Sequence, residues 1–155
     1  MKRKYRERKS SGFTLIEILV VIGIIAVLAG VVLIAVNPGR QFKLARDSQR
    51  TANVNAILNA VGQNIAENKG QFKCNGTVTT IPNSPKIITS DTSTGVDFRH
   101  CIVPDYISEI PYDPTEGSFV SGSNYNTAYV ISKDANGRIT ASSTGEISPS
   151  ISVTR

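Results

Sequence analysis

The sequence has few of the residues from which most catalytic and metal sites are built. Its 155 residues include one histidine, His100, and two cysteines, Cys74 and Cys101. A zinc site made from these three would lack an obvious fourth ligand, and adjacent residues of a strand point to opposite faces. No glycine-rich phosphate-binding motif is present. We therefore predict no catalytic residue, no metal, no cofactor and no enzymatic activity.

A sustained basic surface is also missing. The chain has 17 basic and 12 acidic residues, a formal net charge of +5. Six of the basic residues and one of the acidic residues fall in the first twelve positions, so the rest of the chain is neutral, with eleven of each sign. Nucleic-acid-binding domains usually carry clustered Lys and Arg on their folded surface. Nucleic-acid binding is therefore not indicated.

The dominant feature that is present is an apolar block near the N-terminus. Residues 18–36 read ILVVIGIIAVLAGVVLIAV, and Phe13 to Leu15 extend this block backwards. A helix over residues 13–36 would be about 36 Å long at ~1.5 Å per residue, whereas the hydrocarbon core of a bilayer is about 30 Å thick. A domain this small could not bury such a helix on all sides. The block predicts a tilted transmembrane helix over residues 13–36.

Charge predicts the orientation of this helix. Six basic residues precede the block, and four follow it closely: Arg40, Lys43, Arg46 and Arg50. The denser cluster favours a cytoplasmic N-terminus. An ordinary secretory signal peptide fits less well, because the block is longer than the usual apolar region and no A-x-A-like cleavage site follows it before Asn37.

The first turn of the block carries a specific motif. The run Gly12-Phe13-Thr14-Leu15-Ile16-Glu17 followed by an apolar helix resembles the processing site of the type IV prepilin family, which includes the type II secretion and competence pseudopilins. The likeness covers about the first quarter of the chain. It implies that a prepilin peptidase cuts between Gly12 and Phe13 and then N-methylates Phe13. Residues 1–12 would then be a cytoplasmic leader that is removed, and Gly12, with no side chain, suits a narrow protease cleft.

Glu17 is the candidate assembly residue. An ionised carboxylate in an apolar segment costs up to ~3 kcal/mol on insertion scales, so it needs a partner. Cleavage would create an α-amino group on Phe13, and such groups are mostly cationic at neutral pH. The resemblance points to pairing of Glu17 with the amine of a neighbouring subunit, which would set the axial register of a filament. The alternative is a glutamate that simply reaches the lipid headgroups.

A second helix is predicted over residues 37–70. Asn37-Pro38-Gly39 interrupts the first helix, because proline lacks an amide donor and glycine adds backbone freedom. The charged stretch from Arg40 to Ala52 is interpreted as a solvated or intersubunit surface. An apolar stripe then recurs at helical spacing and needs a covering β-sheet. The stripe consists of Val54, Ile57, Leu58, Val61 and Ile65.

Beyond Gly70 the sequence indicates strands and loops. We predict a variable loop region over residues 71–112 and an antiparallel sheet over residues 113–155. The clearest hairpin joins Thr127–Ser132 to Arg138–Ser142 through Asn136-Gly137, a dipeptide that favours positive φ. Residues 77–81 and 86–89 form either a second strand pair or part of an irregular loop. The fold class is α+β and pilin-like, with the long N-terminal helix packed on a small antiparallel sheet.

Cysteines and acidic loops leave two further questions. Cys74 and Cys101 lie in the part expected outside the cytoplasm, where a disulfide between them would persist. Some secretion pseudopilins bind calcium in C-terminal loops, so a site using Asp113, Glu116 or Asp134 stays open, although a hairpin turn explains residues 134–137 better.

The resemblance favours a structural subunit of a type IV pilus. Its partners would be other copies of the chain in a helical homopolymer, the prepilin peptidase, and an inner-membrane assembly platform driven by an ATPase. The precursor would cross the inner membrane once, and the mature subunit would lie in a cell-surface or periplasmic filament. A type II secretion or competence pseudopilin shares the same N-terminal chemistry and is the main alternative. A monomeric membrane-anchored binding module requires the motif to be coincidental.

Overall fold

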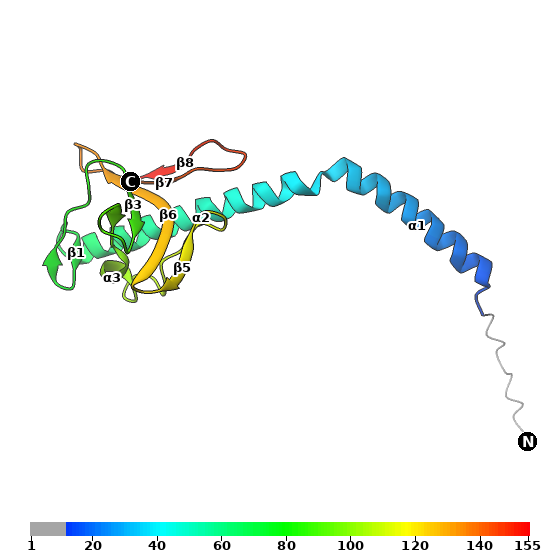
Figure 1. The fold of residues 1–155 in the computed structure, drawn as a ribbon, viewed down its shortest axis with the longest axis horizontal. Helices are drawn as coiled ribbons and strands as arrows, with labels where there is room; N and C mark the ends of the chain where they lie inside the picture. Colours follow the sequence, from blue (N-terminus) through cyan, green and yellow to red (C-terminus); the bar gives the residue numbers. More distant parts are fainter. Residues whose placement is uncertain (1–11) are drawn as a thin grey trace, which may run out of the picture. The chain divides into compact units, whose positions relative to one another are not determined.

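The computed structural model describes residues 12–155 of the chain. It divides into two compact units, Met1–Gln41 and Phe42–Arg155, and we call the second unit the head. Most of the predicted leader, residues 1–11, lies outside the described residues. Helix α1 spans Leu15–Val36 and helix α2 spans Pro38–Glu67, as labelled in Figure 1.

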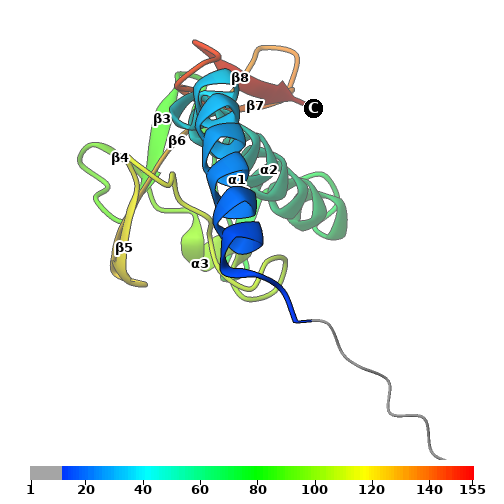
Figure 2. The same cartoon turned by 90° about the vertical axis from the view of Figure 1, so that its right-hand side faces the viewer.

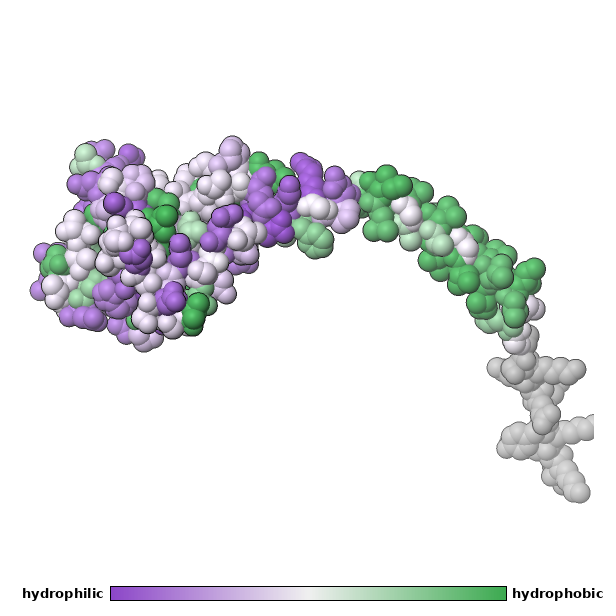
Figure 3. Space-filling model, viewed as in Figure 1, coloured by the Kyte–Doolittle hydropathy of each residue, from purple (hydrophilic) through white to green (hydrophobic). Residues whose placement is uncertain are grey.

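Helix α1 is apolar along its length and none of its 22 residues is buried (Figure 3). It is long and apolar enough to cross a membrane. A helix with no polar face needs an apolar environment on every side. The segment thus matches the transmembrane length predicted from the sequence.

The predicted interruption lies at Asn37. Helix α1 ends at Val36, Asn37 has a left-handed φ of 46°, and Pro38 begins α2. The Asn37 carbonyl accepts a hydrogen bond from the Arg40 amide at 3.0 Å, and its side-chain oxygen accepts from the same amide at 3.3 Å. Asparagine tolerates this backbone conformation and caps a following helix well, so one residue both ends α1 and starts α2.

The head contains two sheets and a short helix. The small sheet pairs β1 with β2, and the main sheet has the order β4-β3-β6-β7-β8, with β5 also paired to β6. Neighbours are antiparallel except β3 and β4, which are parallel. The elements are β1 (Lys73–Cys74), β2 (Thr77–Val78), β3 (Lys86–Thr89), β4 (Gly95–Val96), α3 (Arg99–Ile102), β5 (Ser118–Ser121), β6 (Asn124–Lys133), β7 (Ile139–Ser143) and β8 (Ile151–Thr154).

The predicted hairpin is confirmed. Strands β6 and β7 pair antiparallel from Val130 opposite Ser142 to Lys133 opposite Ile139. Gly137 takes the positive φ, 86°, that the turn requires. The chain reverses there because glycine adopts this conformation without steric cost.

The region over residues 71–112 is more ordered than the predicted variable loop. It contains β1 to β4 and α3, and the main sheet therefore begins before residue 113. Strand β3 pairs with β6 near the middle of the main sheet, whereas Thr77–Val78 pairs with β1. The local pattern did not reveal these partners, because β3 is held by a strand about forty residues away and by burial of Ile88.

The core lies between α2 and the main sheet (Figure 1, Figure 2). The apolar stripe of α2 is buried as predicted, with Ile65 at its margin. Opposite it lie side chains from the sheet, so a sheet does cover the stripe. The sheet contributes Ile88, Tyr129, Ile131 and Ala141 to this core.

The interpretation of residues 40–52 as a solvated or intersubunit surface is wrong for two residues. Asp47 and Arg50 are 6% and 1% exposed within their own chain. Loops after Asp113 and before β8 cover this turn of α2 and supply it with polar partners. The charges are therefore buried as a paired group.

Candidate functional site

The N-terminal end of α1 is organised as a capping box. Thr14 is the N-cap residue, and its hydroxyl oxygen accepts a hydrogen bond from the Glu17 amide at 3.3 Å. In return the Glu17 Oε2 atom accepts from the Thr14 amide and from the Thr14 hydroxyl, both at 3.2 Å. This reciprocal pattern satisfies two of the amides that every helix leaves unpaired at its start.

The capping box positions the Glu17 carboxylate. One oxygen, Oε2, is held by Thr14, and no hydrogen bond within residues 12–155 reaches Oε1. The helix dipole also favours a negative charge in this first turn. Glu17 therefore presents a fixed, exposed acceptor that a cation from outside the chain can approach.

Gly12 and Phe13 lie directly before the capping box and are accessible. Phe13 is 81% exposed. A Cβ atom placed on Gly12 would meet no other atom within 4 Å, so nothing in the fold itself requires glycine there.

A second polar site lies inside the head and centres on Arg50. Its Nε and Nη2 atoms donate to Asp113 at 2.6 and 3.0 Å, and Nη2 also donates to the Thr115 hydroxyl at 2.6 Å. Its Nη1 atom donates to Asp47 at 2.8 Å and to Glu146 at 3.1 Å. Every guanidinium nitrogen of Arg50 thus has a partner, which offsets the cost of burying it.

The carboxylates of this network are stabilised in their ionised form. Backbone amides of Glu146, Ser148 and Ile147 donate to Asp47 and hold its pKa well below the usual range. Arg46, which binds Glu146 through two hydrogen bonds of 2.5 and 2.6 Å, lowers the pKa of Glu146 to about 2, with help from Arg50.

Burial by itself would raise the pKa of Asp113. The Arg50 guanidinium and the amides of Thr115 and Glu116 outweigh burial, so the pKa of Asp113 lies below its usual range. The network therefore stays charged at neutral pH and fastens α2 to the two loops that follow Asp113 and precede β8.

Two of the three candidate calcium ligands, Asp113 and Asp134, are already bound by other groups of the chain. Asp113 is occupied by Arg50 and by loop amides, so it has no free carboxylate for a cation. Asp134 is bound by Arg138 and by the amides of its own hairpin turn. Glu116 stays exposed, but one carboxylate does not make a calcium site.

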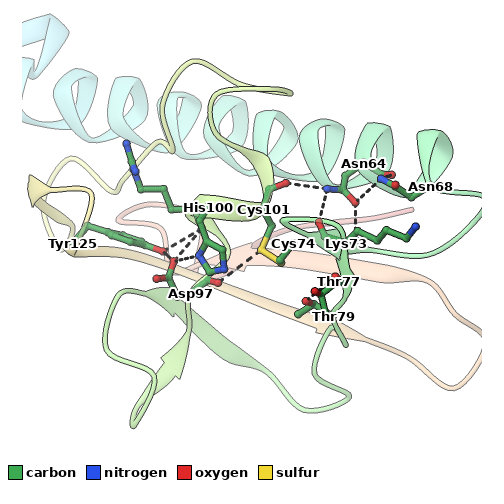
Figure 4. The surroundings of a disulfide bond; sticks show 11 residues. Asn64, Asn68, Lys73, Cys74, Thr77, Thr79, Asp97, His100, Cys101 and Tyr125 are labelled. Carbon is green, nitrogen blue, oxygen red and sulfur yellow. Dashed lines mark hydrogen bonds and ion pairs between the residues drawn. A yellow bond between two sulfur atoms is a disulfide. The ribbon is translucent and has the colours of Figure 1, made fainter.

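Cys74 and Cys101 form the disulfide, which joins β1 to α3 (Figure 4). The Asn64 side chain of α2 points at the same place, where its amide donates to the carbonyls of Lys73 and Cys101 at 2.8 and 2.9 Å. Disulfide and asparagine together fix the segment after α2 to the helix end.

The zinc alternative fails at this same place. His100 lies close to both sulfurs, with the three possible ligand atoms within 4.8 Å of one another. The sulfurs are bonded to each other, however, so neither is a thiolate available to a metal. The His100 Nδ1 atom instead lies 3.4 Å from a carboxylate oxygen of Asp97.

The Arg50 network was missed in the sequence. The only signal for it was the charged stretch from Arg40 to Ala52, which we interpreted as a solvated or intersubunit surface. By contrast, the residues of the processing motif lie together at one helix end, as their adjacency requires.

Comparison with known protein families finds a match for the N-terminal segment. The family model described as the prokaryotic N-terminal methylation motif matches residues 8–33. No curated protein and no solved structure matches the chain. The matched residues include the capping box and most of α1.

Proposed function

This chain carries the N-terminal methylation motif of type IV pilins and pseudopilins, and on that basis we propose that it is a structural subunit of a type IV pilus. The motif belongs to a family of structural proteins that are in general not enzymes. The mature subunit polymerises through α1 and has no catalytic activity of its own.

The first step is processing of a membrane-anchored precursor. A prepilin peptidase cleaves the bond between Gly12 and Phe13 and methylates the new amine of Phe13. Support comes from the matched motif and from the exposure of both residues ahead of the helix cap. The leader, residues 1–12, stays on the cytoplasmic side, because basic residues flanking a transmembrane helix favour that side.

The second step is assembly. The cationic amine of Phe13 in one subunit pairs with Glu17 of its neighbour. The capping box supports this role, since it holds Oε2 and leaves Oε1 without a hydrogen bond from residues 12–155. Inside a bundle of apolar helices only one stagger brings amine and carboxylate together, and a mismatched stagger leaves two buried charges unpaired.

The observation that carries the proposal is that no residue of α1 is buried in a chain with this motif. An apolar helix of 22 residues must be covered by lipid or by other apolar helices. Lipid covers it in the precursor, and α1 helices of other copies cover it in the filament. An inner-membrane assembly platform with its ATPase moves the subunit from the first environment to the second.

The test is the mass and N-terminus of the protein in two fractions. Chains in the cell-surface material released by shearing are expected to begin with methylated Phe13, and precursors in the membrane with Met1. A chain that keeps its leader and never leaves the membrane contradicts the proposal and favours an anchored binding module. A processed chain that stays in the periplasm points instead to a type II secretion or competence pseudopilin, which carries the same motif.

A further inference from the structure

The head exposes an apolar patch on and beside β5, which we call the β5 patch. Val120 is 75% exposed and Tyr112 is 46% exposed. The Tyr112 ring stacks on the Phe119 ring with centroids 6.3 Å apart. The Arg99 guanidinium lies over the Phe119 ring, 5.8 Å from its centroid. Exposed apolar patches with aromatic residues and arginine are typical of protein interfaces.

A groove of about 460 Å³ runs along α2 beside the β6–β7 turn, and we call it the α2 groove. Its lining is largely apolar, with Leu58, Ile65 and Ile139 as the large apolar side chains. Arg155 lies at its edge and donates to the side-chain oxygens of Asn55 and Asn59. Within the described residues no carboxylate side chain pairs with Arg155.

The two features carry complementary charge. Glu116 lies two residues before β5, is exposed, and has no ion pair within residues 12–155. An acidic residue thus precedes the strand that carries the patch, and a basic residue lines the groove. Complementary charges at the rim of an apolar contact set its orientation and register.

Strand β5 and the β6–β7 turn lie at opposite ends of β6 (Figure 1). Strand β5 pairs with the first residues of β6, Asn124 to Asn126. Gly137, which lines the groove, lies in the turn that follows Lys133, the last residue of β6. A strand of ten residues is about 34 Å long. A copy shifted along β6 by about this length would place its β5 near the β6–β7 turn of the first copy, beside the α2 groove.

This geometry is heterologous, because each copy uses two different surfaces. Contacts between unlike surfaces build rings or open filaments, whereas a surface that binds itself builds closed dimers. A polymer that grows by addition of identical subunits needs the first kind.

We propose that the head of one subunit places its β5 patch in the α2 groove of another copy of this chain, with Glu116 facing Arg155. The inference rests on the proposed function, in which copies of the chain form a filament. It adds a head-to-head contact to the polymer formed by α1.

Cysteine cross-linking of full-length chains in filaments tests the contact. The double variant Val120→Cys with Gln63→Cys puts one cysteine in the patch and one in the groove. Mild oxidation of sheared filaments is expected to give a ladder of dimers, trimers and larger species on a non-reducing gel. Each single variant should give no ladder. The matched control pairs Gln63→Cys with Val78→Cys, an exposed residue of β2 outside the patch.

Charge reversal tests the register. Glu116→Lys and Arg155→Glu are each expected to lower the filament yield roughly tenfold, because each places like charges at the rim of the contact. The double variant restores the opposite pair and should recover most of the yield. Recovery separates a contact from a folding defect, since two folding defects would add.

The outcomes separate this inference from the proposed function. Filaments that form normally but give no more ladder than the control pair overturn the head contact and leave the pilin assignment intact. The same holds if both charge reversals leave the yield unchanged. Wild-type chains that are never processed or released overturn the proposed function, and the head contact with it.

Discussion

Arg50 on α2 donates two hydrogen bonds, of 2.6 and 3.0 Å, to Asp113, which lies 63 residues later in the chain. Both side chains are buried. The two parallel bonds fix the plane of the carboxylate as well as its distance. This pair joins α2 to the loop that leads into β5, and β5 is part of the proposed contact between copies.

Loss of one partner of this pair should weaken the fold strongly. Asp113→Ala leaves the buried Arg50 charge without its main partner, so the free energy of unfolding should fall by about 3–5 kcal/mol. Denaturant unfolding of the detergent-solubilised chain measures it. The matched control is Arg138→Ala, which removes the exposed pair with Asp134 and should cost under about 1 kcal/mol. Equal losses in the two variants would show that the buried pair is no more important than a surface one.

Acid should destabilise the head through the same network. The pKa values of Asp47, Asp113 and Glu146 are lower in the folded chain than in the unfolded chain, so the unfolded chain binds more protons below about pH 4. Stability from these groups is then full above about pH 5 and is lost as the pH falls toward 2. Melting temperatures between pH 7 and pH 2 test this.

A variant isolates the contribution of one carboxylate. Glu146→Gln cannot titrate, so its stability should fall less steeply than that of the wild type as the pH drops. An identical slope for the two proteins would mean that acid acts elsewhere in the molecule.

The disulfide should hold the segment after α2 in place. Cys74 and Cys101 are 27 residues apart, and a cross-link over such a loop contributes roughly 3–4 kcal/mol in the chain-entropy model. Cys74→Ser with Cys101→Ser should lower the melting temperature, and added reductant should have little further effect on this variant. Reductant that leaves the wild type unchanged would show that the bridge adds little.

Processing and assembly should separate in two N-terminal variants. Glu17→Ala removes the proposed partner of the Phe13 amine, so the chain should be inserted and cleaved but should not appear in sheared filaments. Gly12→Val should instead accumulate as a full-length precursor in the membrane, because a branched side chain blocks the cleavage site. Western blots of the membrane fraction and of the sheared filament fraction measure processing and assembly separately. Normal filament yield from Glu17→Ala would end the argument for amine pairing.

Features that depend on neighbouring residues could be predicted from the sequence. The apolar block, the interruption at Asn37, the stripe on α2 and the Asn136-Gly137 hairpin each follow from a short pattern with a known period or turn. Each appears in the structure close to its predicted bounds.

Features that depend on distant partners could not be predicted. Arg50 is surrounded by carboxylates three, 63 and 96 residues away, and no local pattern connects them. An isolated arginine on a helix is ordinarily solvated, so its burial depends on loops whose path the sequence leaves open. The pairing of β3 with β6 has the same cause, since strand partners are selected by the assembled core.

The exposed apolar surface of α1 also determines the quantity in which the supply of this protein should be expressed. A subunit whose longest apolar segment has no cover of its own has no appreciable concentration as a free solute. Its supply is then a density per area of membrane, and growth of the proposed filament should follow that density. Dilution of the surrounding medium should leave the supply untouched, whereas expansion of the membrane area at constant copy number should slow growth.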